Sequence, residues 1–171
     1  LLLLLTKVIQ QAGSALSAAH KRGLVHGALT PGNLLFSSQE RAWIADFGLA
    51  RLHPPTAPYL PPELYNASQA SLQMGNAGAY WHAANPASDQ YMFAMLCQQL
   101  FAQLLLQQTY ELFLPVLQRA THQKPERRYP SIDLLVADIQ TLAQHTTGGV
   151  GQAITHPNNH NTGSSPMLPS S

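Results

Sequence analysis

The chain has 171 residues, of which 45% are hydrophobic and 10% are charged, and its formal net charge is +1. This length fits one domain with a hydrophobic core. The low charge argues against nucleic acid as the main partner, because no basic cluster exceeds the short run at residues 124–128. The single cysteine, Cys97, lies in an apolar run, which excludes a disulfide framework within the chain and indicates a buried thiol.

The first predicted element is a helix over residues 1–22. Apolar residues recur at helical spacing from Val8 to Ala19, and Gly23 follows a His-Lys-Arg run, which is typical of a helix end. The five leucines at the start have no basic segment before them and fall far short of the roughly 20 apolar residues that span a membrane. We therefore expect an amphipathic helix or a start inside a longer chain, no membrane segment, and a cytoplasmic location.

Two short apolar runs then predict a β-hairpin, after an extended segment at residues 24–26. Residues 33–36 (Asn-Leu-Leu-Phe) and 42–45 (Ala-Trp-Ile-Ala) are mostly apolar, and the turn-like sequence Ser-Ser-Gln-Glu at residues 37–40 lies between them. From residue 47 to residue 62 the chain is too rich in proline for regular structure, which predicts a loop.

The next stretch divides into a weak segment and a strong helix. Residues 66–87 are rich in Asn, Ala, Gly and Ser, so we expect a loop or a weak insertion there. Residues 87–106 are strongly apolar and predict a helix inside the domain, with Ser88 or Asp89 as its N-cap.

Two further helices are predicted at residues 110–122 and 130–145, and the second opens with a Pro-Ser pair. From residue 146 onward the apolar periodicity is lost and Gly, Ser, Asn and Pro dominate, which predicts a disordered tail or linker. The expected organisation is one domain over residues 1–145 and a tail over residues 146–171.

Short motifs occur in a fixed order along this domain. They are His26-x-x-Leu-x-Pro-x-Asn33, then Asp46-Phe47-Gly48 after the hairpin, then Pro61-Pro62-Glu63, and then Ser88-Asp89 at the start of the apolar helix. A lone Asp-Phe-Gly is weak evidence, but the ordered set resembles the C-terminal lobe of a protein kinase of the bacterial serine/threonine type, over residues 6–143. The resemblance implies a mainly α fold, in which a kinase-like C-lobe carries a small β-hairpin at the catalytic loop and lacks the β-rich N-lobe.

The resemblance assigns roles to two polar pairs. Asn33 and Asp46 would be the ligands of Mg²⁺, which together with ATP is the cofactor that the family implies. Glu63 would pair with Arg128 as a buried charge pair, and this pair would tie the activation segment to the last helices.

Other positions would have structural or regulatory roles by the same resemblance. His26 and Phe47 would pack on each other, with Gly48 as the structural glycine of the same motif. Asp89 would anchor the backbone of the catalytic loop through hydrogen bonds. Thr56 would be the hydroxyl-bearing residue of the activation loop.

The departures from the family pattern concern its chemistry. Gly27 and Ala28 stand where the family has Arg-Asp, and the methyl group of Ala28 at the general-base position cannot accept a proton from a substrate hydroxyl. Losing a general base costs about 10²–10⁴-fold in rate. Thr30 stands where the family has a lysine. Residues 1–171 contain neither a Gly-rich loop nor a strand lysine paired with a helix glutamate. The chain between the helices at 87–106 and 110–122 is short, so we expect the helix used for substrate docking to be reduced or missing.

Three interpretations of function follow from these residues. The first is a pseudokinase, a kinase-like C-lobe without catalytic activity that acts as an interaction or regulatory module for an unidentified protein partner. The second is a genuine ATP-dependent serine/threonine kinase, whose N-lobe lies upstream and which tolerates a weakened catalytic loop. The third is a truncated gene product with no independent function. A Gly-rich loop and a strand lysine upstream would favour the second.

Overall fold

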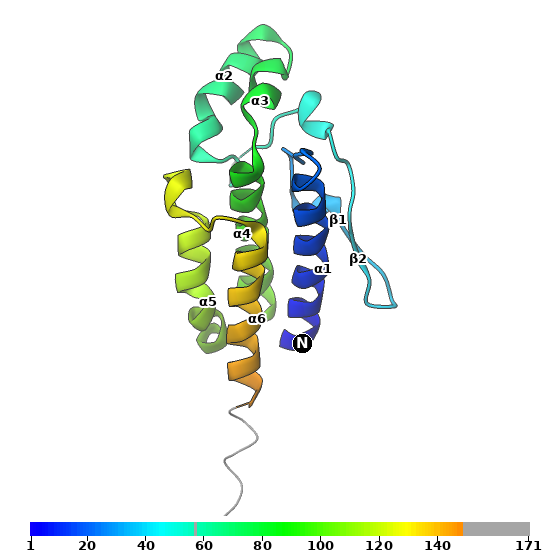
Figure 1. Cartoon of the computed structure of the whole chain (residues 1–171), viewed down its shortest axis with the longest axis vertical. Helices are drawn as coiled ribbons and strands as arrows, with labels where there is room; N and C mark the ends of the chain where they lie inside the picture. Colours follow the sequence, from blue (N-terminus) through cyan, green and yellow to red (C-terminus); the bar gives the residue numbers. More distant parts are fainter. Residues whose placement is uncertain (57, 149–171) are drawn as a thin grey trace, which may run out of the picture.

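Four long helices form the body of the structure, a computed structural model that describes residues 1–56 and 58–148 (Figure 1). In chain order they are α1 (Leu2–His20), α4 (Pro86–Leu104), α5 (Gln107–Ala120) and α6 (Ile132–Gly148). Helix α1 packs against α4 and α6, and helix α5 packs against the same two helices. The expected mainly α fold is confirmed.

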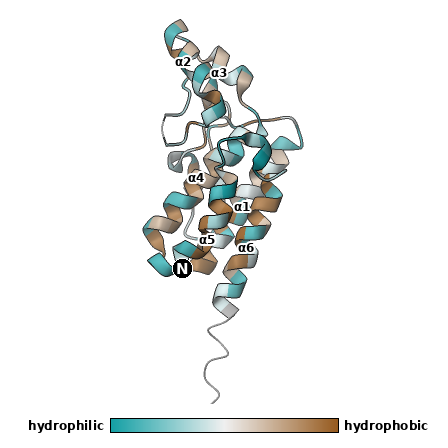
Figure 2. Cartoon of the chain, turned by 90° about the vertical axis from the view of Figure 1, so that its left-hand side faces the viewer, coloured by the Kyte–Doolittle hydropathy of each residue, from teal (hydrophilic) through white to brown (hydrophobic). Residues whose placement is uncertain are grey.

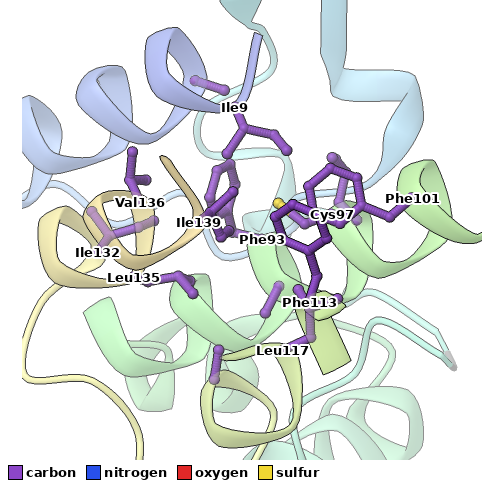
Figure 3. Packing of buried hydrophobic residues seen from close by; sticks show 14 of the residues in the cluster. Ile9, Phe93, Cys97, Phe101, Phe113, Leu117, Ile132, Leu135, Val136 and Ile139 are labelled. Atoms are coloured by element: carbon purple, nitrogen blue, oxygen red, sulfur yellow. The ribbon is translucent and has the colours of Figure 1, made fainter. Parts of the chain in front are cut away.

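The hydrophobic core lies where the apolar stripes of these helices meet, as Figure 2 and Figure 3 show. Ile9 of α1 and Phe93 of α4 are almost fully buried there, and the rings of Phe101 and Phe113 lie with their centroids 4.6 Å apart. Cys97 is buried in the same core, and burial raises the pKa of its thiol. Since each large apolar side chain contributes about 1.5–3 kcal/mol on burial, tertiary packing rather than intrinsic helix propensity holds these helices.

The predicted β-hairpin is present and lies beside α1 (Figure 1). Its antiparallel strands are β1 (Leu34–Phe36) and β2 (Ala42–Ile44), and they pair so that Leu35 lies opposite Trp43. The backbone N–H of Ala42 donates a hydrogen bond of 3.0 Å to the side-chain oxygen of Gln11, which attaches the outer edge of β2 to α1. The hairpin is therefore fixed to the helical body, and the residues at its ends have fixed positions.

The expectation of a loop or weak insertion at residues 66–87 is wrong, because most of this stretch is helical. The two helices are α2 (Tyr65–Met74) and α3 (Gly78–Ala83). Ser and Asn favour turns and caps when taken alone, but here the Ser71 hydroxyl accepts a hydrogen bond of 2.9 Å from the N–H of Tyr80. Gly75 ends α2 with a left-handed backbone at φ 65°. The two helices pack on each other, and Tyr80 of α3 packs on the chain at Ala28, so long-range contacts outweigh the local composition.

The predicted N-cap of the apolar helix is also wrong, because α4 begins before Ser88 and Asp89. The cap is Asn85, whose side-chain oxygen accepts hydrogen bonds from the N–H groups of Ala87 and Ser88. The Ser88 hydroxyl accepts the N–H of Asn85 at 2.7 Å, and Pro86 occupies the first helical position. Because this local motif satisfies the helix start, the Asp89 side chain is available for contacts inside the domain.

The connections and the end of the described chain bear on the remaining expectations. Only Leu105 and Leu106 connect α4 to α5, which leaves no room for a docking helix between them.

Helix α6 runs to Gly148, so the chain is helical for a few residues beyond the expected domain boundary. Residues 149–171 lie outside the described residues, and their assignment as a tail stays a prediction. No helix in the described ranges has both the length and the apolar character needed to cross a bilayer.

Candidate functional site

The hairpin brings two of the predicted site residues together. Asn33 directly precedes β1, and Asp46 follows β2 after one intervening residue, Ala45. Since the strands are antiparallel, the start of one lies beside the end of the other, and the N–H of Ala45 donates to the Asn33 carbonyl oxygen at 2.8 Å. The side-chain nitrogen of Asn33 donates to a carboxylate oxygen of Asp46 at 3.1 Å.

The side-chain oxygen of Asn33 is already used by Thr30. It accepts the backbone N–H of Thr30 at 3.2 Å and the Thr30 hydroxyl at 3.0 Å, which closes the short 3-10 turn at Pro31–Asn33. A backbone N–H can only donate and a carboxylate can only accept. The two neighbours of Asn33 therefore fix its amide with the oxygen toward Thr30 and the nitrogen toward Asp46.

This arrangement does not fit a magnesium ion. Mg²⁺ takes oxygen ligands in a strict octahedral geometry, whereas the Asn33 amide turns its N–H group toward Asp46. Rotating the amide would give up the two hydrogen bonds from Thr30, each worth about 0.5–1.5 kcal/mol. Within the residues that the structure describes, no group of three or more His, Cys, Asp and Glu side chains could hold a metal. The assignment of Asn33 and Asp46 as metal ligands stays a prediction, and their geometry does not favour it.

Asp89 lies at the centre of the hydrogen bonds that hold the loop. Its side chain is fully buried and accepts the backbone N–H of His26 at 2.8 Å and that of Gly27 at 2.7 Å. The ring of His20, at the end of α1, lies 2.8 Å from the same carboxylate. Three partners satisfy a buried charge that would otherwise be costly. In the sequence, His20 has no signal beyond its position at a helix end, so this contact could not be foreseen.

His26 packs on Phe47, and its ring nitrogens are both engaged. The two rings lie with centroids 4.7 Å apart at an angle of 57°. One nitrogen, Nε2, lies 2.8 Å from the carbonyl oxygen of Ala45, and Nδ1 accepts the N–H of Ala28 at 3.2 Å. These partners require the tautomer with its proton on Nε2. Gly48, which follows Phe47, has a φ of 89° that suits glycine.

Ala28 and its surroundings are closed to solvent. Ala28 is only 4% exposed and belongs to a small apolar cluster with Ala50, Leu64 and Tyr80. The Tyr80 hydroxyl donates to the carbonyl oxygen of Gly27 at 2.8 Å. Tyr80 lies in the stretch for which the composition predicts a loop or weak insertion, and no local pattern indicates this contact.

Glu63 and Arg128, which are 65 residues apart, form a two-pronged ion pair with N···O distances of 2.8 and 2.7 Å. The Arg128 side chain is fully buried and that of Glu63 is 19% exposed. Arg128 also donates to the carbonyl oxygens of Ala87 and His122, and its guanidinium lies 5.0 Å from the ring centroid of Tyr91. The pair joins the end of the segment at residues 46–63 to the start of α4 and to the chain before α6.

Thr56 is exposed in this segment, and the residue that follows it lies outside the described residues. Within residues 1–56 and 58–148, no hydrogen bond or ion pair joins Thr56 to another predicted site residue.

Comparisons with known proteins find similarity to bacterial serine/threonine kinases. No protein-family model matches it. It is 35% identical over 95 residues to the serine/threonine-protein kinase PknA of Mycobacterium tuberculosis, a match that covers 52% of this chain and 20% of PknA. It is 44% identical over 43 residues to PknE of the same species, which covers 25% of this chain and 8% of PknE.

Solved structures agree with the sequence matches. The kinase domain of PknI from Mycobacterium tuberculosis superposes with a TM-score of 0.56 at 25% identity, over 81% of this chain and 54% of that domain. A double mutant of the same domain gives a TM-score of 0.53 at 27% identity, over 82% of this chain and 54% of the other. The chain therefore spans about half of a solved kinase domain, and a fifth of the curated relative with the longer match.

Proposed function

We propose that this chain, whose resemblance to part of a bacterial-type serine/threonine kinase is confirmed in sequence and in fold, is a pseudokinase that acts as an interaction or regulatory module. The observation that carries the proposal is the buried methyl group of Ala28 at the general-base position. The loop over residues 24–33 contains no Asp, Glu, Lys or Arg, so no carboxylate in it accepts a proton and no cation in it neutralises a phosphoryl group.

His26 does not replace the missing base. It is fully buried, and its two ring nitrogens already face the Ala45 carbonyl oxygen and the Ala28 N–H. A general base must reach the proton that it abstracts, directly or through one water molecule. Both nitrogens of the His26 ring are therefore engaged in contacts that hold the loop, which supports a structural role for His26.

The outer face of the hairpin supports an interaction role. Leu35 and Trp43 lie directly opposite each other, and they are 50% and 49% exposed. Exposed apolar side chains that gather in one place are typical of protein interaction surfaces. The proposed partner is therefore a protein rather than nucleic acid, and we propose that the pair meets in the cytoplasm.

The second candidate is a genuine kinase with an N-lobe encoded upstream. The similarity to the serine/threonine-protein kinase PknA supports it. A longer version of the protein that includes an N-lobe would distinguish the two candidates. Activity in that version, with Ala28 unchanged, would favour the second.

The chain should transfer no phosphate from ATP and Mg²⁺ to itself or to a generic protein substrate. The reason is the joint loss of the catalytic carboxylate at Ala28 and of the cations at Gly27 and Thr30. The measurement is radiolabel incorporation, with Asp46→Ala as the control. Incorporation that survives Asp46→Ala comes from a contaminant, whereas incorporation that this change abolishes would contradict the proposal.

Mg²⁺ and ATP should leave the melting temperature of the chain unchanged. A ligand present at about 100 times its Kd stabilises a protein by about 2.7 kcal/mol, which raises the melting temperature of a chain of this size by several degrees. Asn33→Asp is the positive control, because two adjacent carboxylates repel each other and a divalent cation relieves that repulsion. We expect Mg²⁺ to stabilise this variant alone. A clear rise for the native chain would show that the Asn33 amide does turn to bind the ion.

A further inference from the structure

Helix α3 directs two adjacent aromatic residues at the catalytic-loop segment. Tyr80 is fully buried, and its hydroxyl donates to the Gly27 carbonyl oxygen at 2.8 Å. Its backbone N–H donates to Ser71 of α2 at 2.9 Å, so both helices share the contact. Burial raises the pKa of Tyr80, and the charges of Asp89 and Glu63 raise it further. The hydroxyl therefore keeps the proton that it donates to the loop.

Trp81 and Ala50 fill the space beside Gly27. A Cβ atom added to Gly27 would lie 2.9 Å from the Cβ of Ala50 and 3.4 Å from the ring of Trp81. Gly27 also has a φ of 75°, a backbone conformation that other residues rarely adopt. Glycine at position 27 therefore allows three segments of the chain, at Gly27, Ala50 and Trp81, to pack closely.

Trp81 also contacts the segment that follows Asp46-Phe47-Gly48. Ala50 is fully buried in the short 3-10 turn at Leu49–Arg51, and the Arg51 guanidinium lies 4.6 Å from the ring centroid of Trp81. This cation–π contact and the packing of Ala50 tie the segment to α3. Residues 65–88 contain no Asp, Glu, Lys or Arg, so Arg51 supplies the charged group of this contact, and the Tyr80 hydroxyl supplies a neutral hydrogen bond.

We propose that helices α2 and α3 form a built-in latch, in which Tyr80 and Trp81 hold the loop at Gly27–Ala28 and the turn at Leu49–Arg51 together without any phosphate on Thr56. In a phosphorylation-controlled loop, an arginine beside the general base would hold the phosphate. Here glycine replaces that arginine, and an aromatic residue from a different helix supplies the anchor. The latch also covers the Ala28 position, so the loop stays closed. This inference concerns the conformation of the segment, and it stands whether or not the chain is an enzyme.

Hydrogen exchange followed by mass spectrometry on the full chain tests the latch. The reporters are backbone N–H groups that are hydrogen-bonded within the turn, those of Arg51, Leu52 and His53. Trp81→Ala should raise their exchange by about tenfold or more, because the turn loses its anchor. The matched control is Trp43→Ala, which removes the other of the two tryptophans from an exposed position on the hairpin. This control should leave the exchange rates of these amides unchanged.

Two smaller changes keep the test decisive if Trp81→Ala fails to fold. Tyr80→Phe removes only the hydroxyl group and should raise exchange at residues 24–33. Arg51→Gln removes only the cation–π contact and should raise exchange in the turn. Thr56→Glu adds a negative charge in place of a phosphate, and it should leave the exchange rates of all these amides unchanged. Equal exchange in all of the latch variants and the control, or a large effect of Thr56→Glu on the turn, would overturn the proposal.

Discussion

Glu63→Ala should lower the free energy of unfolding by about 3–5 kcal/mol, because it leaves the Arg128 guanidinium buried without its counter-charge. The guanidinium is fully buried, and both of its terminal nitrogens lie within hydrogen-bond distance of the Glu63 carboxylate. Its other acceptors are neutral carbonyl oxygens, which cannot balance the charge. Urea denaturation measures the effect, and the slope of the transition should stay the same if the variant remains folded.

The Lys7–Glu40 pair offers a control that differs mainly in burial. It has the same N···O distance of 2.7 Å, but its side chains are 51% and 53% exposed, against 0% and 19% for Arg128 and Glu63. Exposed pairs contribute about 0–1 kcal/mol, so Glu40→Ala should cost far less than Glu63→Ala. Replacing Glu63 and Arg128 together by apolar residues should recover part of the loss, since no unpaired charge then remains. Equal costs for the two single variants would contradict the burial argument.

Introducing the residues that the kinase family has at these positions, by Gly27→Arg, Ala28→Asp and Thr30→Lys, should destabilise the chain by at least about 3 kcal/mol and should not produce a kinase. A left-handed backbone disfavours any residue with a Cβ, and the arginine would displace Ala50 and Trp81. The new carboxylate would enter an apolar cluster where Ala28 is 4% exposed, and no cation in that cluster would pair with it. Denaturation measures the first effect, and autophosphorylation measures the second.

Single variants separate these causes. Thr30→Lys alone changes a half-buried position at the edge of the loop, so it should cost less than Gly27→Arg or Ala28→Asp alone. Most of the acceleration by a kinase comes from positioning the phosphates and from stabilising their charge, which a general base does not supply. Activity in the restored chain by itself would show that the loop residues matter more than this geometry suggests. A restored chain as stable as the native one would contradict the close packing at Gly27.

Sequence patterns predicted much of the scaffold and the order of the motifs. Helical periodicity located α1, α4 and α6, and the paired apolar runs located the hairpin, because burial of one face leaves a regular trace in the sequence. The same reasoning failed at residues 66–87, where small and polar residues carry no such trace. It also failed at the N-cap of α4, because Asn85 and Pro86 lie at the end of a stretch whose composition predicts a loop.

What residues 24–33 lack can be recognised without a structure, since Ala28 carries no carboxylate. The contacts at these positions come from the fold: Tyr80 on Gly27, Trp81 and Ala50 beside Gly27, and the Asn33 amide turned toward Thr30. These contacts depend on the relative orientation of segments that are distant in the chain or on the rotation of a single side chain. Contacts of this kind leave no periodic pattern in the sequence, because the contacting residues are not regularly spaced along the chain. The absence of charged side chains from residues 24–33 is therefore a property of the sequence, whereas the burial of Ala28 is a property of the fold.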